Sequence, residues 1–142
     1  MKRKERTQVL VEGDRDLLGS IAREVEQAHE VEVVREPVEE LVMLKMRESA
    51  RRSQFYLGEA LMTSCVVRIG EAYGYGMVLG EDRDKAFDLA IVDAAYTLSD
   101  PADDLRAHDE RIAEEQERIA AQKRLRNEAL LRTQVDFSTM EA

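Results

Sequence analysis

The side chains best suited to metal binding or catalysis are scarce in this chain, which has two histidines and one cysteine. His29 and His108 lie far apart, and neither has a second histidine or a cysteine at metal-ligand spacing. Cys65 lies in an apolar run, which is typical of a small buried residue and not of a reactive thiol. The sequence therefore predicts no metal site, no disulfide and no cysteine nucleophile.

The other candidates for catalysis are carboxylates and hydroxyls, and their settings are ordinary. Glu114 and Glu115 lie in a long polar stretch, where carboxylates usually form a solvated helix face, and we expect His108 to be solvated there too. Thr63 and Ser64 lack the G-x-S-x-G context of a nucleophile. We expect this chain to supply no catalytic residue.

Three glycines, Gly74, Gly76 and Gly80, resemble a phosphate-binding loop only superficially. Their spacing fits neither the G-x-G-x-x-G fingerprint nor a loop ending in Gly-Lys-Ser/Thr. Glycines within a strand more often mark a bulge or a close approach of another backbone. We favour that interpretation over ligand binding.

Arginine is the remaining residue type with a chemical use, because its guanidinium group binds anions. Arg51 and Arg52 are adjacent in a polar loop, and Arg68 lies in the apolar stretch that follows. These three are candidate anion-binding residues, although exposed arginines on a loop are common.

Composition narrows the possible functions. The 142 residues include 30 acidic and 21 basic ones, for a net charge of −9, which argues against nonspecific nucleic-acid binding. The basic N-terminus is not followed by an apolar signal segment, and no run of about 18 apolar residues occurs. We expect a cytoplasmic protein that is not bound to a membrane.

The residues that could do chemistry must be positioned by a central block, residues 55–95. Its apolar residues first alternate and then recur at helical spacing, which predicts strands followed by a helix that packs on them. Gly58-Glu59 and Gly70-Glu71 are predicted breaks between strands. Ala86 and Ala90 would let that helix approach the sheet closely.

Around this block the sequence predicts an α+β fold: a small, mainly antiparallel sheet covered by helices, with a long C-terminal helix and an extended tail. We expect residues 1–99 to form the core domain and residues 100–142 to serve partner contact. The predicted elements are a short helix or turn at 6–12, a helix capped by Asp14, strands at 31–34 and 41–47 joined as a hairpin through Glu36-Pro37, a hairpin of 65–69 with 73–79, a helix at 83–98 capped by Asp82, and a helix at 102–133 started by Asp100 and Pro101.

The last predicted helix is mostly polar. Leu105, Ile112 and Ile119 recur every seven residues, but the intervening heptad positions, His108 and Glu115, are polar, so the apolar seam is too thin for an independent coiled coil. We expect this helix to lie along another surface. Apolar residues recur in the tail that follows this helix. We predict partner contact for Leu105, Ile112, Ile119, Val135, Asp136, Phe137, Thr139 and Met140.

Taken together, these residues resemble the PhnG family, a small subunit of the bacterial carbon–phosphorus lyase core complex. The resemblance starts at about residue 30 and rests on a central block, a long charged helix and a Val-Asp-Phe-x-Thr-Met ending. The residues that carry it include Gly58, Glu59, Thr63, Gly74, Tyr75, Gly80 and Asp93, for which we expect structural roles.

The resemblance implies a subunit of α-D-ribose 1-methylphosphonate 5-triphosphate synthase, which joins ATP-derived ribose triphosphate to an alkylphosphonate and releases adenine. It implies partners of the PhnI, PhnH and PhnJ types, with the nucleosidase activity associated with PhnI. The complex would use ATP, but this chain would bind no cofactor. The sequence departs from the family in having Glu81 where a basic residue is usual and in lacking tryptophan.

Three functional hypotheses follow. The first is a noncatalytic structural subunit of the lyase system. The second is a subunit that contributes anion-binding arginines to a shared active site. The third is a free-standing helical adaptor unrelated to phosphonates.

Overall fold

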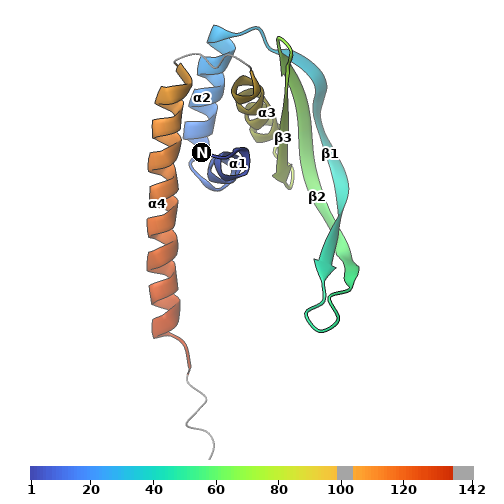
Figure 1. Cartoon of the computed structure of the whole chain (residues 1–142), viewed down its shortest axis with the longest axis vertical. Helices are drawn as coiled ribbons and strands as arrows, with labels where there is room; N and C mark the ends of the chain where they lie inside the picture. The colour runs from blue at the N-terminus through green and yellow to red at the C-terminus, as the bar shows by residue number, and fades with distance from the viewer. Residues whose placement is uncertain (99–103, 136–142) are drawn as a thin grey trace, which may run out of the picture.

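A computed structural model describes residues 1–98 and 104–135 of the chain (Figure 1). The three strands form one antiparallel sheet in the order β1-β2-β3, which confirms the predicted α+β class and the long C-terminal helix. The elements in chain order are α1 (Arg3–Glu12), α2 (Arg15–Ala28), β1 (Glu32–Arg47), β2 (Gln54–Ile69), β3 (Ala72–Leu79), α3 (Arg83–Thr97) and α4 (Asp104–Arg132).

Helix α3 packs closely on β2 and β3, and small residues on both sides allow this approach. A Cβ atom added at Gly74 would lie 2.0 Å from the carbonyl oxygen of Ala90, and one at Gly76 would lie 1.8 Å from that of Ala86. The prediction that these glycines mark a close backbone approach is confirmed. Cys65 lies beneath the same helix, fully buried, where burial raises the pKa of its thiol.

Two helices begin at the capping residues that the sequence predicts. The Asp14 side chain accepts a hydrogen bond from the backbone N–H of Asp16, and the Asp82 side chain accepts one from that of Lys85. Both residues are therefore the predicted N-caps. The predicted start at Asp100 and Pro101 lies outside the described residues.

The predicted hairpin of two short strands at 31–34 and 41–47 is wrong, because both belong to the single 16-residue strand β1. Pro37 does not end β1, since it lies on an edge strand within a register shift between Arg35 and Val38. The predicted break at Gly58-Glu59 is also wrong. Gly58 lies inside β2, next to a register shift that absorbs one extra residue as a bulge.

Helix α4 has two halves with different surroundings. Its first half lies against α1 and α2, where Ile112 is completely buried in the core. Every described residue from Gln122 onward is exposed. Whether residues 100–142 act as a unit for partner contact stays a prediction.

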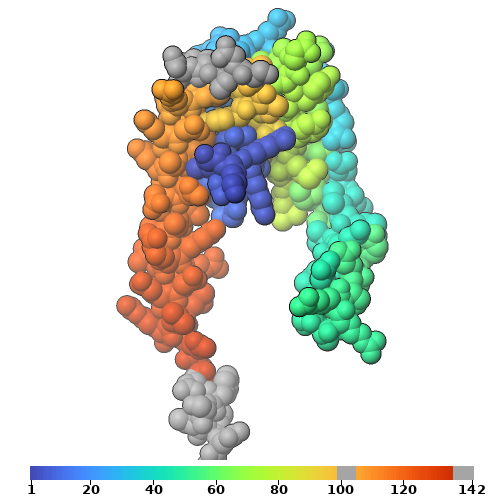
Figure 2. Space-filling model, in the orientation of Figure 1, coloured from blue at the N-terminus to red at the C-terminus, as the bar shows by residue number. Residues whose placement is uncertain are grey.

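The molecule consequently consists of a body and two projections. The body holds α1, α2, α3, β3 and the parts of β1, β2 and α4 that pack against them. From it the far end of the β1–β2 hairpin and the second half of α4 extend in the same direction, with open space between them (Figure 2).

Candidate interaction surface

The far end of the β1–β2 hairpin exposes a large apolar surface. Strand β3 pairs with β2 only as far as Met62, which lies opposite Leu79, so residues 41–61 extend beyond the third strand; we call them the β-arm. Its exposed large apolar side chains are Leu41, Met43, Leu44, Met46, Phe55, Tyr56, Leu57 and Leu61. A contiguous apolar surface of this kind marks a contact site for another molecule.

The two strands of the β-arm are held to each other by antiparallel pairing from Leu41 opposite Leu61 to Arg47 opposite Gln54. Leu41 is 64% exposed and Leu57 is 59% exposed, values more typical of polar residues. Because apolar side chains lie on both faces of this two-stranded ribbon, they cannot be explained as one side of the protein's own core.

The outer face of β3 is a second exposed apolar surface. Tyr73, Tyr75, Met77 and Leu79 alternate along the strand with buried residues that face α3, and all four are exposed. This surface adjoins the β-arm through the pairing of Leu79 with Met62.

The second half of α4, residues 122–132, is the other projection, and we call it the helical arm. Leu125, Leu130 and Leu131 are between 59% and 68% exposed, and Val135 just beyond the helix is 65% exposed. Leucines so exposed on a helix otherwise rich in charge indicate a contact surface.

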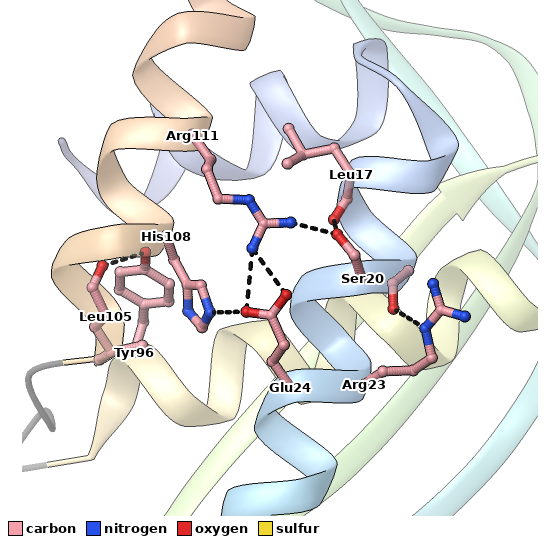
Figure 3. A network of polar contacts seen from close by, with 9 residues as sticks. Leu17, Ser20, Arg23, Glu24, Tyr96, Leu105, His108 and Arg111 are labelled. Carbon is pink, nitrogen blue, oxygen red and sulfur yellow. Dashed lines mark hydrogen bonds and ion pairs between the residues drawn. The ribbon is translucent and has the colours of Figure 1, made fainter.

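Polar contacts between α4 and α2 fix the direction of the helical arm. The Nε2 atom of His108 lies 2.8 Å from a carboxylate oxygen of Glu24, and Arg111 donates to Glu24 and to the hydroxyl of Ser20. In Figure 3 the side chains of His108 and Arg111 both point from α4 toward Glu24 on α2. The hydrogen bond from His108, with the Arg111 guanidinium, lowers the pKa of Glu24.

His108 is 4% exposed, so the expectation that it is solvated is wrong. The expectation of an exposed Glu115 is also wrong, because Glu115 is 8% exposed. It accepts hydrogen bonds from the backbone N–H of Asp14 at 2.7 Å and from Arg118, and the bond from Arg118 lowers its pKa. These two polar heptad positions are buried because Glu24 of α2 and the backbone of Asp14, which caps α2, supply partners for them.

A buried carboxylate, Asp93, joins α1, α3 and β3. It accepts hydrogen bonds from Arg3 at 2.8 and 2.5 Å and from the backbone N–H of Tyr75 at 2.9 Å, and Arg6 lies 3.5 Å away. The guanidinium of Arg6 lies over the ring of Tyr96, 4.0 Å from its centroid. These contacts make Asp93 an ion-pair centre that ties α1 and β3 to α3.

Thr63 has a similar structural use at the turn between β3 and α3. Its hydroxyl donates to the carbonyl of Gly80 at 2.6 Å and accepts from the backbone N–H of Asp82 at 3.2 Å. Gly80 has φ +83, a backbone conformation that suits glycine. Of the other motif residues, Glu59 is an exposed β-arm residue and Gly58 is part of the β-arm bulge.

The residues predicted to contact a partner differ in how exposed they are in the structure. Leu105 and Ile119 are half-buried against the protein's own core, and Ile112 is completely buried in it, so the prediction of partner contact is wrong for Ile112. Val135 is exposed. Asp136, Phe137, Thr139 and Met140 lie outside the described residues.

The three candidate anion-binding arginines are not brought together. Arg51 and Arg52 lie exposed in the turn of the β-arm, whereas Arg68 lies near the opposite end of β2. Arg68 forms an ion pair with Glu32 of the neighbouring strand. A single anion site built from all three is therefore excluded.

Two further kinds of site are absent from residues 1–98 and 104–135. No group of three or more His, Cys, Asp or Glu side chains there is arranged to hold a metal ion. None of the helices in these ranges has the length and apolar character that a membrane span requires.

Sequence reasoning missed the β-arm as a surface, although one signal was present. The run from Leu41 to Met46 places apolar residues at both odd and even positions, which a strand with one solvated face does not do. The buried positions of His108 and Glu115 had no such signal, since their partners lie 84 and 101 residues away in the sequence.

Comparisons with known proteins agree with the resemblance found in the sequence. The family model described as phosphonate metabolism protein PhnG matches residues 1–141. The chain is also 34% identical over 118 residues to a protein of Rhizobium meliloti (strain 1021) named alpha-D-ribose 1-methylphosphonate 5-triphosphate synthase subunit PhnG, covering 82% of this chain and 73% of that protein. This chain belongs to the PhnG family of phosphonate metabolism proteins.

Proposed function

We propose that the protein is a noncatalytic structural subunit of the carbon–phosphorus lyase system. It supports the synthase that joins ATP-derived ribose triphosphate to an alkylphosphonate and releases adenine, and it assembles with subunits of the PhnI, PhnH and PhnJ types. Family membership supports the pathway, since the Rhizobium relative is named as a subunit of that synthase.

The observation that carries a structural role is the β-arm. Eight large apolar side chains are exposed on its two faces. Exposing them to water is unfavourable by roughly 25 cal/mol per Å² of apolar surface, and a partner that covers them removes this cost. Of the titratable groups that are buried elsewhere, Asp93, His108 and Glu115 hold helices together.

The test removes most of the β-arm, including five of its eight exposed apolar side chains, and keeps the body. Residues 44–58 are replaced by Asn-Gly, a pair that forms a tight hairpin turn and here joins Met43 to Glu59, which already lie opposite each other. None of the replaced residues is buried, so the isolated variant should fold. We expect it to lose copurification with coexpressed partner subunits.

A matched control keeps the apolar surface and changes only its shape, through Phe55→Leu with Leu57→Met. This variant should still assemble. Stoichiometric copurification of the shortened chain, with its circular dichroism and melting temperature unchanged, would refute the proposal. Deletion of residues 134–142 tests the contribution of the tail separately, and we expect weaker assembly with an intact fold.

A second candidate role, arginines contributed to a shared active site, is favoured at the β-arm turn, where Arg51 and Arg52 are adjacent and exposed. The test is Arg51→Ala with Arg52→Ala in the assembled complex. An intact complex with unchanged nucleotide turnover would exclude this role and leave the structural one.

A further inference from the structure

The two arms continue the surfaces that form the core of the body. On the sheet, the face that packs on α3 includes Cys65 and Val67, which pair with Gly76 and Gly74. Side chains alternate along a strand, so the same face of β2 includes Leu61 farther along. Leu41 lies opposite Leu61 and shares that face.

The same face runs on toward the β-arm turn. Met43 follows Leu41 by two residues, and Lys45 pairs with Tyr56, with its ammonium group 5.3 Å from the centre of the Tyr56 ring. Nothing in the described chain covers these residues, because α3 begins at Arg83, which is bound to Glu39 just before the β-arm.

The helical arm repeats this arrangement. Leu130 follows Ile112 by 18 residues, which is five turns of an α-helix, so both lie on the same side of α4. Ile112 is buried against the body, whereas Leu130 is 59% exposed. Arg126, one turn before Leu130, lies close to the same stripe.

These surfaces line the open space between the arms, which we call the interarm hollow (Figure 2). A hollow with several apolar residues on the β-arm wall and Leu130 on the helical wall, formed by extensions of a protein core, fits an inserted polypeptide segment. A flat membrane surface would contact only the tips of the arms.

Charge indicates what kind of segment this is. The β-arm has four basic and two acidic residues, and the helical arm has four basic and one acidic. The arms therefore have net charges of +2 and +3, and the rest of the chain has −14, since the whole carries −9. On the faces toward the hollow, Lys45, Arg47 and Arg126 outnumber Glu59, and Lys123, on the same side of α4, is paired with Glu12 of α1.

We propose that the interarm hollow binds one apolar segment of a partner subunit, and that this segment has acidic residues along its edges. This inference rests on the proposed function, because it names the chemistry of the surface that the structural subunit binds. The apolar residues supply the contact area, and the basic residues select the partner and its orientation.

The first test uses charge reversal in the complex assembled with the partner subunits. Lys45→Glu with Arg126→Glu should lower the affinity on the order of tenfold, because both charges then repel the segment. The matched control, Lys4→Glu with Arg106→Glu, makes the same change in net charge at two exposed positions of the body, outside both arms. It should change the affinity less than about threefold. Equal effects of the two pairs would overturn the inference.

The second test maps the occupant by placing a photo-crosslinking amino acid at Met43 or at Leu130. Crosslinks from both positions to one acidic, apolar segment of a single partner subunit are the expected result. Crosslinks to different subunits, to residues 136–142 of this chain or to a second copy would overturn the inference. A wild-type chain that forms no complex would refute the proposed function as well. Binding to vesicles of anionic phospholipid that is lost in the Lys45→Glu, Arg126→Glu variant would identify a membrane contact instead.

Discussion

The two halves of β2 are similarly apolar in sequence but have opposite surroundings. Residues 63–69 are largely buried between α3 and the neighbouring strands, with Val67 0% exposed. Residues 54–61 include Phe55, Tyr56 and Leu57, and all three are exposed. The difference arises because β3 and α3 cover only one end of β2. Apolar composition therefore indicates that a strand will be covered, without indicating whether its own chain covers it.

The strongest test of the covered half is Gly76→Ala. The added Cβ would lie 1.8 Å from the Ala86 carbonyl oxygen, and α3 would have to move away from the sheet. We expect a loss of more than about 3 kcal/mol in the free energy of unfolding, at the upper end for overpacked cores. Denaturant unfolding measures it.

The control is the same change in a helix, Gly19→Ala. Its Cβ would come no closer than 3.7 Å to another side chain, and alanine favours α2. It should stabilise the protein by up to about 1 kcal/mol. Similar losses at both glycines would show that α3 does not pack as closely as described.

Asp93→Ala should have the next largest effect, because it leaves Arg6 buried without its carboxylate. Removing one partner of a buried ion pair costs about 3 kcal/mol or more. Asp88→Ala, which removes the more exposed pair with Arg15, should cost less than about 1 kcal/mol. Thermal unfolding of the two variants compares them, and equal losses would contradict the structural role of Asp93.

Acid should affect α4 before the rest of the body. The folded protein holds the pKa of Glu115 below its ordinary value of 4.5, mainly through the hydrogen bond from Arg118. The ionised carboxylate therefore stabilises the docked helix above about pH 4.5, and this stabilisation is lost as the pH falls through the lowered pKa. The protection of residues 104–119 from hydrogen exchange, relative to the intrinsic rate at each pH, should fall below pH 4.5, before that of α3.

In Glu115→Gln, the protection of α4 amides from exchange should already be lower at pH 7 and should change less on acidification. A wild-type α4 that exchanges no faster than α3 throughout acidification would contradict this account of how the helix is held.

The smallest effect on stability is expected in the uncovered half of β2. Leu57→Ser changes a side chain that is 59% exposed, so the free energy of unfolding should change by less than about 0.5 kcal/mol. Urea titration of the isolated chain measures this. A loss above about 1 kcal/mol would mean that the β-arm packs on the body in solution.

Local signals in the sequence predicted much of the fold. Asp14 and Asp82 were identifiable as helix caps, and Gly74 with Ala90 indicated the close helix–sheet contact. The length of β1 was not predictable in the same way. Pro37 usually ends a strand, and only a free edge and a register shift, which depend on the whole sheet, allow the strand to continue.

The candidate interaction surface was less predictable, because it depends on where neighbouring elements stop. Ile112, Ile119 and Leu130 look alike in sequence, but α1 and α2 reach only the first two. An apolar residue stays exposed, and can contact a partner, only where the elements that would cover it have ended. Those elements are distant in the chain.

The separation of charge has a consequence for how the protein meets its partner. At a distance the chain is an anion of charge −9, and an acidic subunit would be repelled by it. Within about one Debye length, roughly 8 Å at physiological ionic strength, only the nearest charges act on the partner. These charges are positive when the two arms face the partner. In other orientations the same electrostatic field repels the acidic partner. The distribution of charge therefore orients the two proteins before their apolar surfaces come into contact.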